Sequence, residues 1–191
     1  MRKNGVDYRP VSPKQVLADG VGLIPEDRKH QGLILGQSIR KNISYSSLRR
    51  YVGKIPTIKA KKENELAARM IRELDIRTPS AEQLARNLSG GNQQKVVLAK
   101  ILATECDIMI FDEPTRGIDV GAKQEIYALM CALAEAGKSI IMISSEMPEL
   151  IGVSHRIVVM GGRTVVGELQ KEAFSQTQIL EMASSQLSPK E

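Results

Sequence analysis

Residues 108–113 read Ile-Met-Ile-Phe-Asp-Glu, and this stretch decides the fold class. Four consecutive apolar residues are typical of a strand that is buried on both faces, as in parallel sheets. The strand ends in two carboxylates, Asp112 and Glu113, at the edge where open parallel sheets bind their ligands. Asp112 suits Mg²⁺, which prefers oxygen ligands, and Glu113 can accept a proton from an attacking water. The alternative is a solvated acidic pair without a function.

The chain on both sides of this strand alternates between extended and helical patterns. We expect strands at 21–24, 107–111, 139–143, 156–160 and 164–167, and helices at 13–19, 90–103, 120–136, 147–151 and 171–182. Apolar strands that alternate with helices predict an α/β fold with a parallel sheet flanked by helices.

A mainly helical subdomain is expected over residues 38–87. Ser38 can cap a helix that runs to about Leu48, and a second helix is expected from Lys59 onward. Its apolar residues recur at the helical period: Leu66, Ala67, Met70, Ile71 and Leu74.

Positive charge is concentrated in the first part of the chain. Residues 1–80 contain 17 Lys and Arg against 8 Asp and Glu, whereas residues 81–191 contain 10 against 14. A basic surface can bind nucleic acid, anionic lipid or an acidic partner, but a solvated helix face also explains it. Only two Phe and four Tyr are present, so platforms for stacking bases are scarce. No apolar stretch approaches the roughly 20 residues that span a bilayer.

A second chemical element is Leu88-Ser89-Gly90-Gly91-Asn92-Gln93-Gln94-Lys95. It places a hydroxyl and two glycines at the start of a helix, where free N–H groups and the helix dipole attract an anion. A plain Ser-capped helix start is the alternative, and it explains Ser89 but not the two glycines.

These motifs together resemble the ATPases of ABC transporters. LSGGNQQK is similar to their signature motif, IMIFDEP to their Walker B strand, and Thr115–Asp119 to their D-loop. With Pro25-Glu26-Asp27-Arg28-Lys29 and Ile143-Ser144-Ser145-Glu146, the pattern resembles the second ATPase half of the duplicated ATP-binding subunits of bacterial monosaccharide importers (ribose, xylose and galactose type).

The resemblance implies a partial P-loop (RecA-like) ABC ATPase core plus the helical subdomain, and it implies roles for individual residues. Glu113 and Ser145 would be catalytic, Asp112 would bind Mg²⁺, and the nucleotide would contact a further set. That set is Ser89, Gly90, Gly91, Gln93, Asp119 and Glu26.

Departures from the family pattern are equally specific. No Gly-x-x-x-x-Gly-Lys-Ser/Thr phosphate loop is present; before Gly137-Lys138-Ser139, Ala132 stands where the first Gly is required. Glu26 stands near the Q-loop position that usually holds Gln, and Ser145 stands where the switch His is expected. We therefore expect a chain that begins after its Walker A motif and does not hydrolyse ATP by itself.

The expected domain organisation is one ABC ATP-binding domain in three parts. Residues 1–37 would be a core remnant with the Q-loop-like segment, 38–87 the helical subdomain, and 88–191 the signature, Walker B, D-loop and switch core. ABC ATPase halves pair head to tail, so the expected cofactors are ATP and Mg²⁺ and the expected role is to supply the signature to a partner's ATP site.

The expected partners are a second ABC ATPase half, membrane permease subunits and, indirectly, a periplasmic sugar-binding protein, but no nucleic acid. The expected location is cytoplasmic, peripheral on the inner face of the cell membrane. Two alternatives remain open: an inert or regulatory fragment that binds partners without nucleotide, and a non-transport ABC ATPase that acts on nucleic acid.

Three smaller expectations concern the core and its edges. Cys106 and Cys131 are expected as buried, reduced thiols. His30 and His155 have no nucleophile motif beside them and are expected to be structural or surface residues. Apolar sheet surface is expected to be exposed near Leu23, Ile108 and Ile141.

Overall fold

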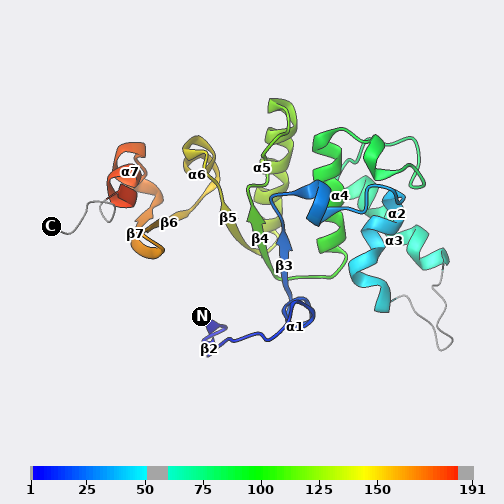
Figure 1. Ribbon diagram of the computed structural model, residues 1–191, viewed down its shortest axis with the longest axis horizontal. Coiled ribbons are helices and arrows are strands. Elements are labelled where there is room, and N and C mark those ends of the chain that lie inside the picture. Colours follow the sequence, from blue (N-terminus) through cyan, green and yellow to red (C-terminus); the bar gives the residue numbers. More distant parts are fainter. Residues whose placement is uncertain (1, 51–59, 185–191) are drawn as a thin grey trace. The chain divides into compact units, whose positions relative to one another are not determined.

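The strand that ends at Asp112 lies in the middle of a three-stranded parallel sheet in the computed structural model, which describes residues 2–50 and 60–184 (Figure 1). The strand order is β3 (Val21–Ile24), β4 (Ile108–Asp112) and β5 (Ser139–Ile143). In this register Phe111 lies opposite Ile24 on one side and Met142 on the other. The predicted α/β fold with a parallel sheet is confirmed, but the expected strands at 156–160 and 164–167 lie outside this sheet and pair with each other antiparallel.

Contacts divide the chain into two units, Met1–Ile143 and Ser144–Glu191. Besides the sheet, the first unit contains a short β-hairpin, five α-helices and three short helical turns in its described residues. They are β1 (Arg2–Lys3), β2 (Val6–Asp7), α1 (Pro13–Ala18), η1 (Arg28–Gly32), α2 (Ile39–Ser44), η2 (Tyr45–Arg50), α3 (Ala60–Glu73), η3 (Ala85–Asn87), α4 (Gly90–Leu102) and α5 (Val120–Glu135).

One face of the sheet packs against α4 and α5. Met109 and Phe111 from β4 are buried, and they belong to the same apolar cluster as Val97 on α4 and Ile126 on α5. Gly22 of β3 is needed for this packing, because a Cβ at that position would lie 2.4 Å from the side chain of Ile101. The helix that begins at Gly90 is therefore fixed against the strand that ends at Asp112.

Apolar side chains are exposed on the opposite face of the sheet. Leu23 on β3 and Ile141 on β5 lie opposite Ile110 on either side of β4. Leu23 and Ile141 are each 51% exposed and Ile143 is 50% exposed, whereas Ile108 is half-buried. The expected exposure is confirmed at Leu23 and Ile141 and is only partial at Ile108.

The helical part of the first unit follows the predicted apolar pattern but has different bounds. Leu66, Ala67, Met70 and Leu74 are buried, as the spacing predicts. The expected helix over 38–48 is an α-helix only to Ser44 and continues as the 3-10 helix η2. The Ser44 hydroxyl lies 3.2 Å from the carbonyl oxygen of Lys41, a local contact that competes with helical hydrogen bonding. The expected helix start at Lys59 lies outside the described residues.

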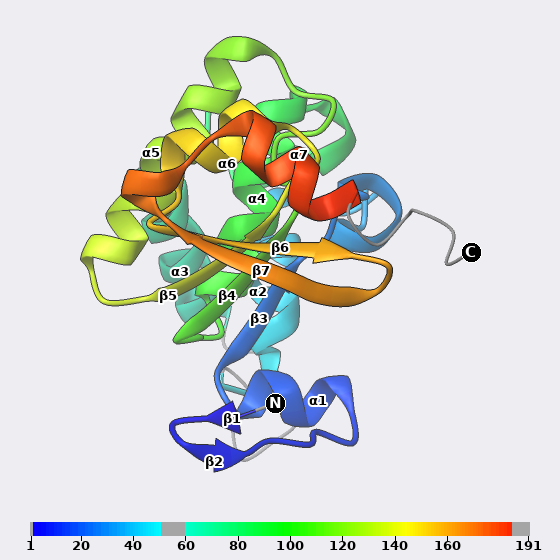
Figure 2. The same ribbon diagram turned by 90° about the vertical axis from the view of Figure 1, so that its left-hand side faces the viewer.

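The second unit is built on an antiparallel hairpin. It contains α6 (Met147–Val153), β6 (Arg156–Gly161), β7 (Thr164–Gln170), η4 (Lys171–Ala173) and α7 (Gln176–Ser184). Figure 2 shows β6 beside β7, and the two strands pair antiparallel with their own small core of Ile157, Val159, Leu169 and Ile179.

The expected helix over 171–182 starts later, because Phe174 is extended and interrupts it; the regular helix begins at Gln176.

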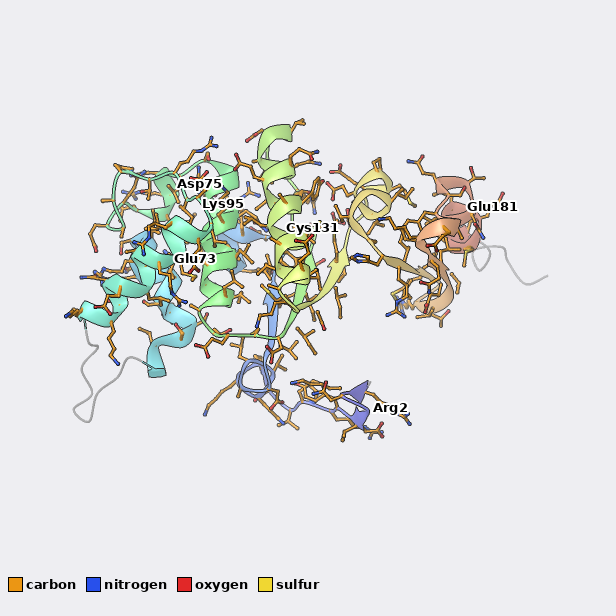
Figure 3. All side chains as sticks on the ribbon, turned by 180° about the vertical axis from the view of Figure 1, so that it is seen from behind. Arg2, Glu73, Asp75, Lys95, Cys131 and Glu181 are labelled. Carbon is orange, nitrogen blue, oxygen red and sulfur yellow. The ribbon has the colours of Figure 1, made fainter. Side chains whose placement is uncertain are left out.

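The cysteines differ from expectation in one respect. Both are free thiols, and Cys106 is buried, but Cys131 is exposed on α5 (Figure 3). The prediction of a second buried thiol is wrong, because position 131 lies on the exposed face of α5, whereas Ile126 and Met130 are the residues that this helix buries. Among the described residues, no helix combines the length and apolar character needed to cross a membrane.

Candidate functional site

The start of α4 is capped by Ser89. Its hydroxyl oxygen accepts hydrogen bonds from the Asn92 backbone N–H at 3.4 Å and from the Asn92 side-chain amide at 3.0 Å. Ser89 is exposed, Gly90 is half-buried and Gly91 is buried. The remaining N–H groups of a first helical turn have no partners within the helix, so they attract anions. The surface is therefore a hydroxyl and a positive helix end with little side-chain bulk.

The two glycines, Gly90 and Gly91, lie against different neighbouring residues. A Cβ on Gly91 would lie 2.5 Å from the Cβ of Ala122, so this glycine lets α4 approach the first turn of α5. A Cβ on Gly90 would lie 2.9 Å from Nη2 of Arg28 and 3.4 Å from the carbonyl oxygen of Gly117. Neither position tolerates a larger residue without movement of its neighbours.

Asp119 caps α5 beside this helix start. Its carboxylate accepts a hydrogen bond from the Ala122 N–H at 2.9 Å, and its side chain is exposed. A hollow of about 140 Å³ lies between the two helix starts. It is lined by Arg77, Ser89, Gly91, Asn92, Asp119, Gly121, Ala122 and Glu125. Three predicted site residues, Ser89, Gly91 and Asp119, therefore come together in space.

Asp112 and Glu113 stand at the carboxyl end of β4. The Glu113 backbone has φ +45, a left-handed conformation that is uncommon for a residue with a side chain. Its N–H donates to the carbonyl oxygen of Ile143 at 2.9 Å, which ties the ends of β4 and β5 together. Both carboxylates are half-buried at the ligand-binding edge of the sheet.

Oxygen donors of this kind fit Mg²⁺, which binds one or two carboxylates and takes its other ligands from water and phosphate. Among the described residues, no group of three or more His, Cys, Asp or Glu could hold a metal ion by itself. Asp112 could therefore contribute to a Mg²⁺ site only together with ligands such as those of a nucleotide.

Two predicted site residues have other contacts. The Gln93 side chain is buried, and its amide donates to the carbonyl oxygen of Ala85 at 3.2 Å, so it lies inside the protein rather than at the exposed helix start. Glu26 forms an ion pair with Arg116, which lies in the segment between β4 and α5. Ser145 is the second residue after β5 and is exposed, and it belongs to the second unit.

Lys95 is a site-supporting residue that the sequence did not single out by itself. Its side chain is 3% exposed, and its ammonium donates to the Asp75 carbonyl oxygen at 2.8 Å; Figure 3 labels both residues. The ammonium also pairs with Glu125 at 2.8 Å. Arg77 donates to the other oxygen of Glu125 at 2.9 Å. The hydrogen bond from Lys95 lowers the pKa of Glu125. This network connects the end of α3, the signature helix α4 and α5.

The signal that could have identified Lys95 is its neighbourhood. Val96, Val97 and Leu98 are all buried, so α4 is enclosed on most sides, and a lysine inside such a helix requires partners. Arg77 has no comparable signal, because it lies in a loop that carries no periodic pattern.

A comparison with protein families matches residues 4–116 to the family described as ABC transporter. Among curated proteins, the ribose import ATP-binding protein of Clostridium tetani is 47% identical over 172 residues, which is 90% of this chain and 34% of that protein. An ATP-binding protein of Burkholderia ambifaria named for ribose, galactose and methyl galactoside import is 51% identical over 96% of this chain and 36% of its own length. The chain thus spans about a third of the length of these relatives.

Solved structures show the same fold. A dimeric ATP-binding cassette in a post-hydrolysis state, bound to ADP and Pi, superimposes with a TM-score of 0.73 at 19% identity, over 90% of this chain and 73% of that chain. The protein cbiO1 from Clostridium perfringens, part of an ABC transporter complex, gives a TM-score of 0.71 at 20% identity, over 96% and 71%.

Proposed function

Because the chain belongs to the ABC transporter family, we propose that it is the ATP-binding component of a monosaccharide importer and supplies its signature surface to an ATP site of a partner half. The observation that carries this proposal is the start of α4. There the Ser89 residue is exposed at the first turn of α4, and Asp119 caps the neighbouring helix across a hollow of about 140 Å³.

The γ-phosphate would be held by this helix start. The Ser89 hydroxyl and the first N–H groups of α4 would donate hydrogen bonds to its oxygens. Phosphoryl transfer depends on position and charge neutralisation, which fixed donors supply without covalent chemistry. Gln93 contributes from inside, because its bond to Ala85 fixes the first turn of α4 against η3.

The strand end would belong to this chain's own nucleotide site. Asp112 would hold Mg²⁺, and Glu113 would accept a proton from the attacking water. When bound, Mg²⁺ neutralises phosphate charge. Ser145, in the position where a His is expected, can donate a hydrogen bond but is a poor proton acceptor at neutral pH. This site also lacks a phosphate loop within the sequence, so we infer that its contribution to turnover is small.

The partners follow from the same assignment. We propose a second ABC ATPase half that carries a phosphate loop, permease subunits that contact the helical part around α2 and α3, and a periplasmic sugar-binding protein that acts through the permease. The location would be the cytoplasmic side of the membrane. The names of the relatives support import of a sugar, and ribose is the substrate that the names of both relatives share.

A reconstitution tests the trans role. The chain is added to an ABC ATPase half that carries a phosphate loop, and steady-state ATP turnover is measured with and without it. The wild-type chain is expected to raise turnover, and Gly90→Asp is expected to abolish that gain. Equal stimulation by both chains would instead favour a module that binds its partner without touching nucleotide.

A further inference from the structure

The segment Pro25–Lys29 lies against the loop that follows β4. β3 and β4 are parallel neighbours with Ile24 opposite Phe111, so the segments after these strands leave the same edge of the sheet. Arg28 donates from Nη1 to the carbonyl oxygen of Arg116 at 2.8 Å and from Nη2 to that of Gly117 at 2.9 Å. The planar guanidinium reaches two consecutive carbonyls at once, which a lysine ammonium cannot do in a fixed geometry.

The contact is reciprocal. While Arg28 holds the backbone at Arg116, the Arg116 side chain forms an ion pair with Glu26, two residues before Arg28. Each segment therefore supplies a charged side chain to the other. This arrangement commits Glu26 to an intramolecular partner.

The turn that carries Arg28 is anchored at both ends. At the start of the turn, the Asp27 carboxylate accepts hydrogen bonds from the backbone N–H groups of Lys29 and His30 at 3.0 and 3.1 Å. The same carboxylate lies 2.7 Å from Nδ1 of His30. That last hydrogen bond lowers the pKa of Asp27. At its end, the carbonyl oxygen of Gly32 accepts a hydrogen bond from Lys100 on α4. The turn is thus fixed to the signature helix.

Arg28 also fills the space beside the signature glycine. A Cβ on Gly90 would lie 2.9 Å from Nη2 of Arg28. Gly117, which accepts from the same nitrogen, has φ +67, and the next-but-one residue is Asp119, the cap of α5. The guanidinium therefore connects the turn η1, the first residue of α4 and the loop that leads to Asp119.

We propose that Arg28 is a positioning residue that fixes the 116–119 loop relative to the start of α4, with the Glu26–Arg116 pair as its second point of attachment. The segment Glu26–Arg28 and the residues Arg116 and Gly117 form what we call the Arg28 latch. The role of the Arg28 latch in ATP hydrolysis rests on the proposed function, because the latch acts by fixing the position of Asp119 relative to Gly90. The latch itself is independent of nucleotide.

Hydrogen exchange on this chain tests the latch without ATP. Arg28→Gln is expected to raise the exchange rate of the amides at 116–122 by about tenfold or more, since hydrogen bonds to a charged donor are lost. The amides of Met109–Phe111 in β4 are expected to keep their rates. Lys29→Gln removes the same charge from the next, exposed residue and is expected to change neither set. Unchanged exchange at 116–122, or an equal rise in β4, would overturn the proposal.

Three further variants keep the test valid if Arg28→Gln folds poorly. Arg28→Lys keeps the charge but cannot donate to two carbonyl oxygens in a fixed geometry, so it is expected to raise the exchange rate at 116–122 severalfold. Wild-type exchange rates in this variant would refute binding of two carbonyls by Arg28. Glu26→Gln and Arg116→Gln are each expected to raise the exchange rate at 116–122 about two- to fivefold. The double variant is expected to raise it no further, because each substitution breaks the same ion pair. Additive effects of those two variants would refute the second attachment.

The reconstituted ATP site separates the latch from the proposed function. Arg28→Lys is expected to lower the kcat of the stimulated reaction at least about threefold while the KM for ATP stays the same, because a positioning residue acts after binding. If Gly90→Asp has no effect while the exchange results hold, the proposed function fails and the latch stands. If Gly90→Asp abolishes stimulation while Arg28 variants exchange like wild type, the latch fails alone.

Discussion

Gly91 on α4 faces Ala122 on α5 so closely that a Cβ added to Gly91 would lie 2.5 Å from the Cβ of Ala122. This contact sets the separation of the two helix starts that form the candidate site. Gly91→Ala is expected to destabilise the chain by about 1–3 kcal/mol, because one of the helices must move. Urea unfolding measures the loss.

The reciprocal variant provides the control for this contact. Ala122→Gly removes the opposing methyl group, so the double variant Gly91→Ala/Ala122→Gly is expected to recover most of the stability lost by Gly91→Ala. If the double variant is less stable than Gly91→Ala by the full cost of a helical glycine, about 1 kcal/mol, this contact does not set the spacing.

Lys95 is expected to stabilise the junction of α3, α4 and α5. Lys95→Met leaves the Asp75 carbonyl and the Glu125 carboxylate without this donor, and hydrogen bonds to charged groups contribute about 1.5–3 kcal/mol. Glu125 is partly exposed, so we expect the lower part of that range. Denaturant unfolding measures the effect, and Lys62→Met on the exposed side of α3 is the matched control. Equal stabilities of the two variants would contradict the assignment.

The same pair predicts a pH dependence. The hydrogen bond from Lys95 lowers the pKa of Glu125 below its ordinary value of 4.5. A carboxylate with a lowered pKa stabilises the folded state above its unfolded pKa, and this contribution is lost as the pH falls through the folded pKa. The stability difference between wild type and Lys95→Met should therefore shrink as the pH falls below about 4.5. A constant difference would show that Glu125 does not depend on Lys95.

The exposed face of the sheet predicts self-association. Leu23 and Ile141 are each 51% exposed and flank Ile110, and contiguous apolar surface favours association. Light scattering should show a mass that rises with concentration, and Leu23→Thr/Ile141→Thr should reduce the rise. Val11→Thr, at an 89% exposed position outside the sheet, should have no effect. A wild-type chain that stays monomeric at all concentrations would refute this prediction.

The chain by itself is expected to turn over ATP slowly. Its sequence contains no Gly-x-x-x-x-Gly-Lys-Ser/Thr loop, so the backbone groups and lysine that hold the β- and γ-phosphates are missing from it. Steady-state phosphate release should stay well below about 1 s⁻¹, the lower end of typical enzyme turnover. A rate of 1 s⁻¹ or more that disappears in Glu113→Gln would show an intact site in this chain.

Local sequence signals predicted the elements that form the site. Ser89 caps α4 as expected, and β5 has the predicted bounds because its apolar run is flanked by polar residues. The helix start at Gln176 was missed, since helical spacing alone cannot show that Phe174 is extended.

Contacts between distant residues could not be predicted in the same way. Arg28 and Arg116 are 88 residues apart, and the periodicity of the sequence does not indicate which carbonyl oxygen a guanidinium will bind. The burial of Gln93 could not be predicted for the same reason, because its partner Ala85 lies in a short turn with no regular sequence pattern. Sequence reasoning therefore found the groups that face solvent at the site but not the contacts that hold them in place.

The measurement that tests the central claim most directly compares Gly90→Asp with Glu113→Gln in the assembled importer, with sugar transport and ATP turnover as readouts. Gly90→Asp places a carboxylate where the γ-phosphate must approach the backbone, and like charges repel strongly where water is scarce. It should abolish both activities while the partner half still binds nucleotide. Glu113→Gln should cost less, because Ser145 already stands in place of the switch His. A Glu113→Gln variant that is impaired more severely than Gly90→Asp would contradict the assignment of this chain as the donor of the signature surface.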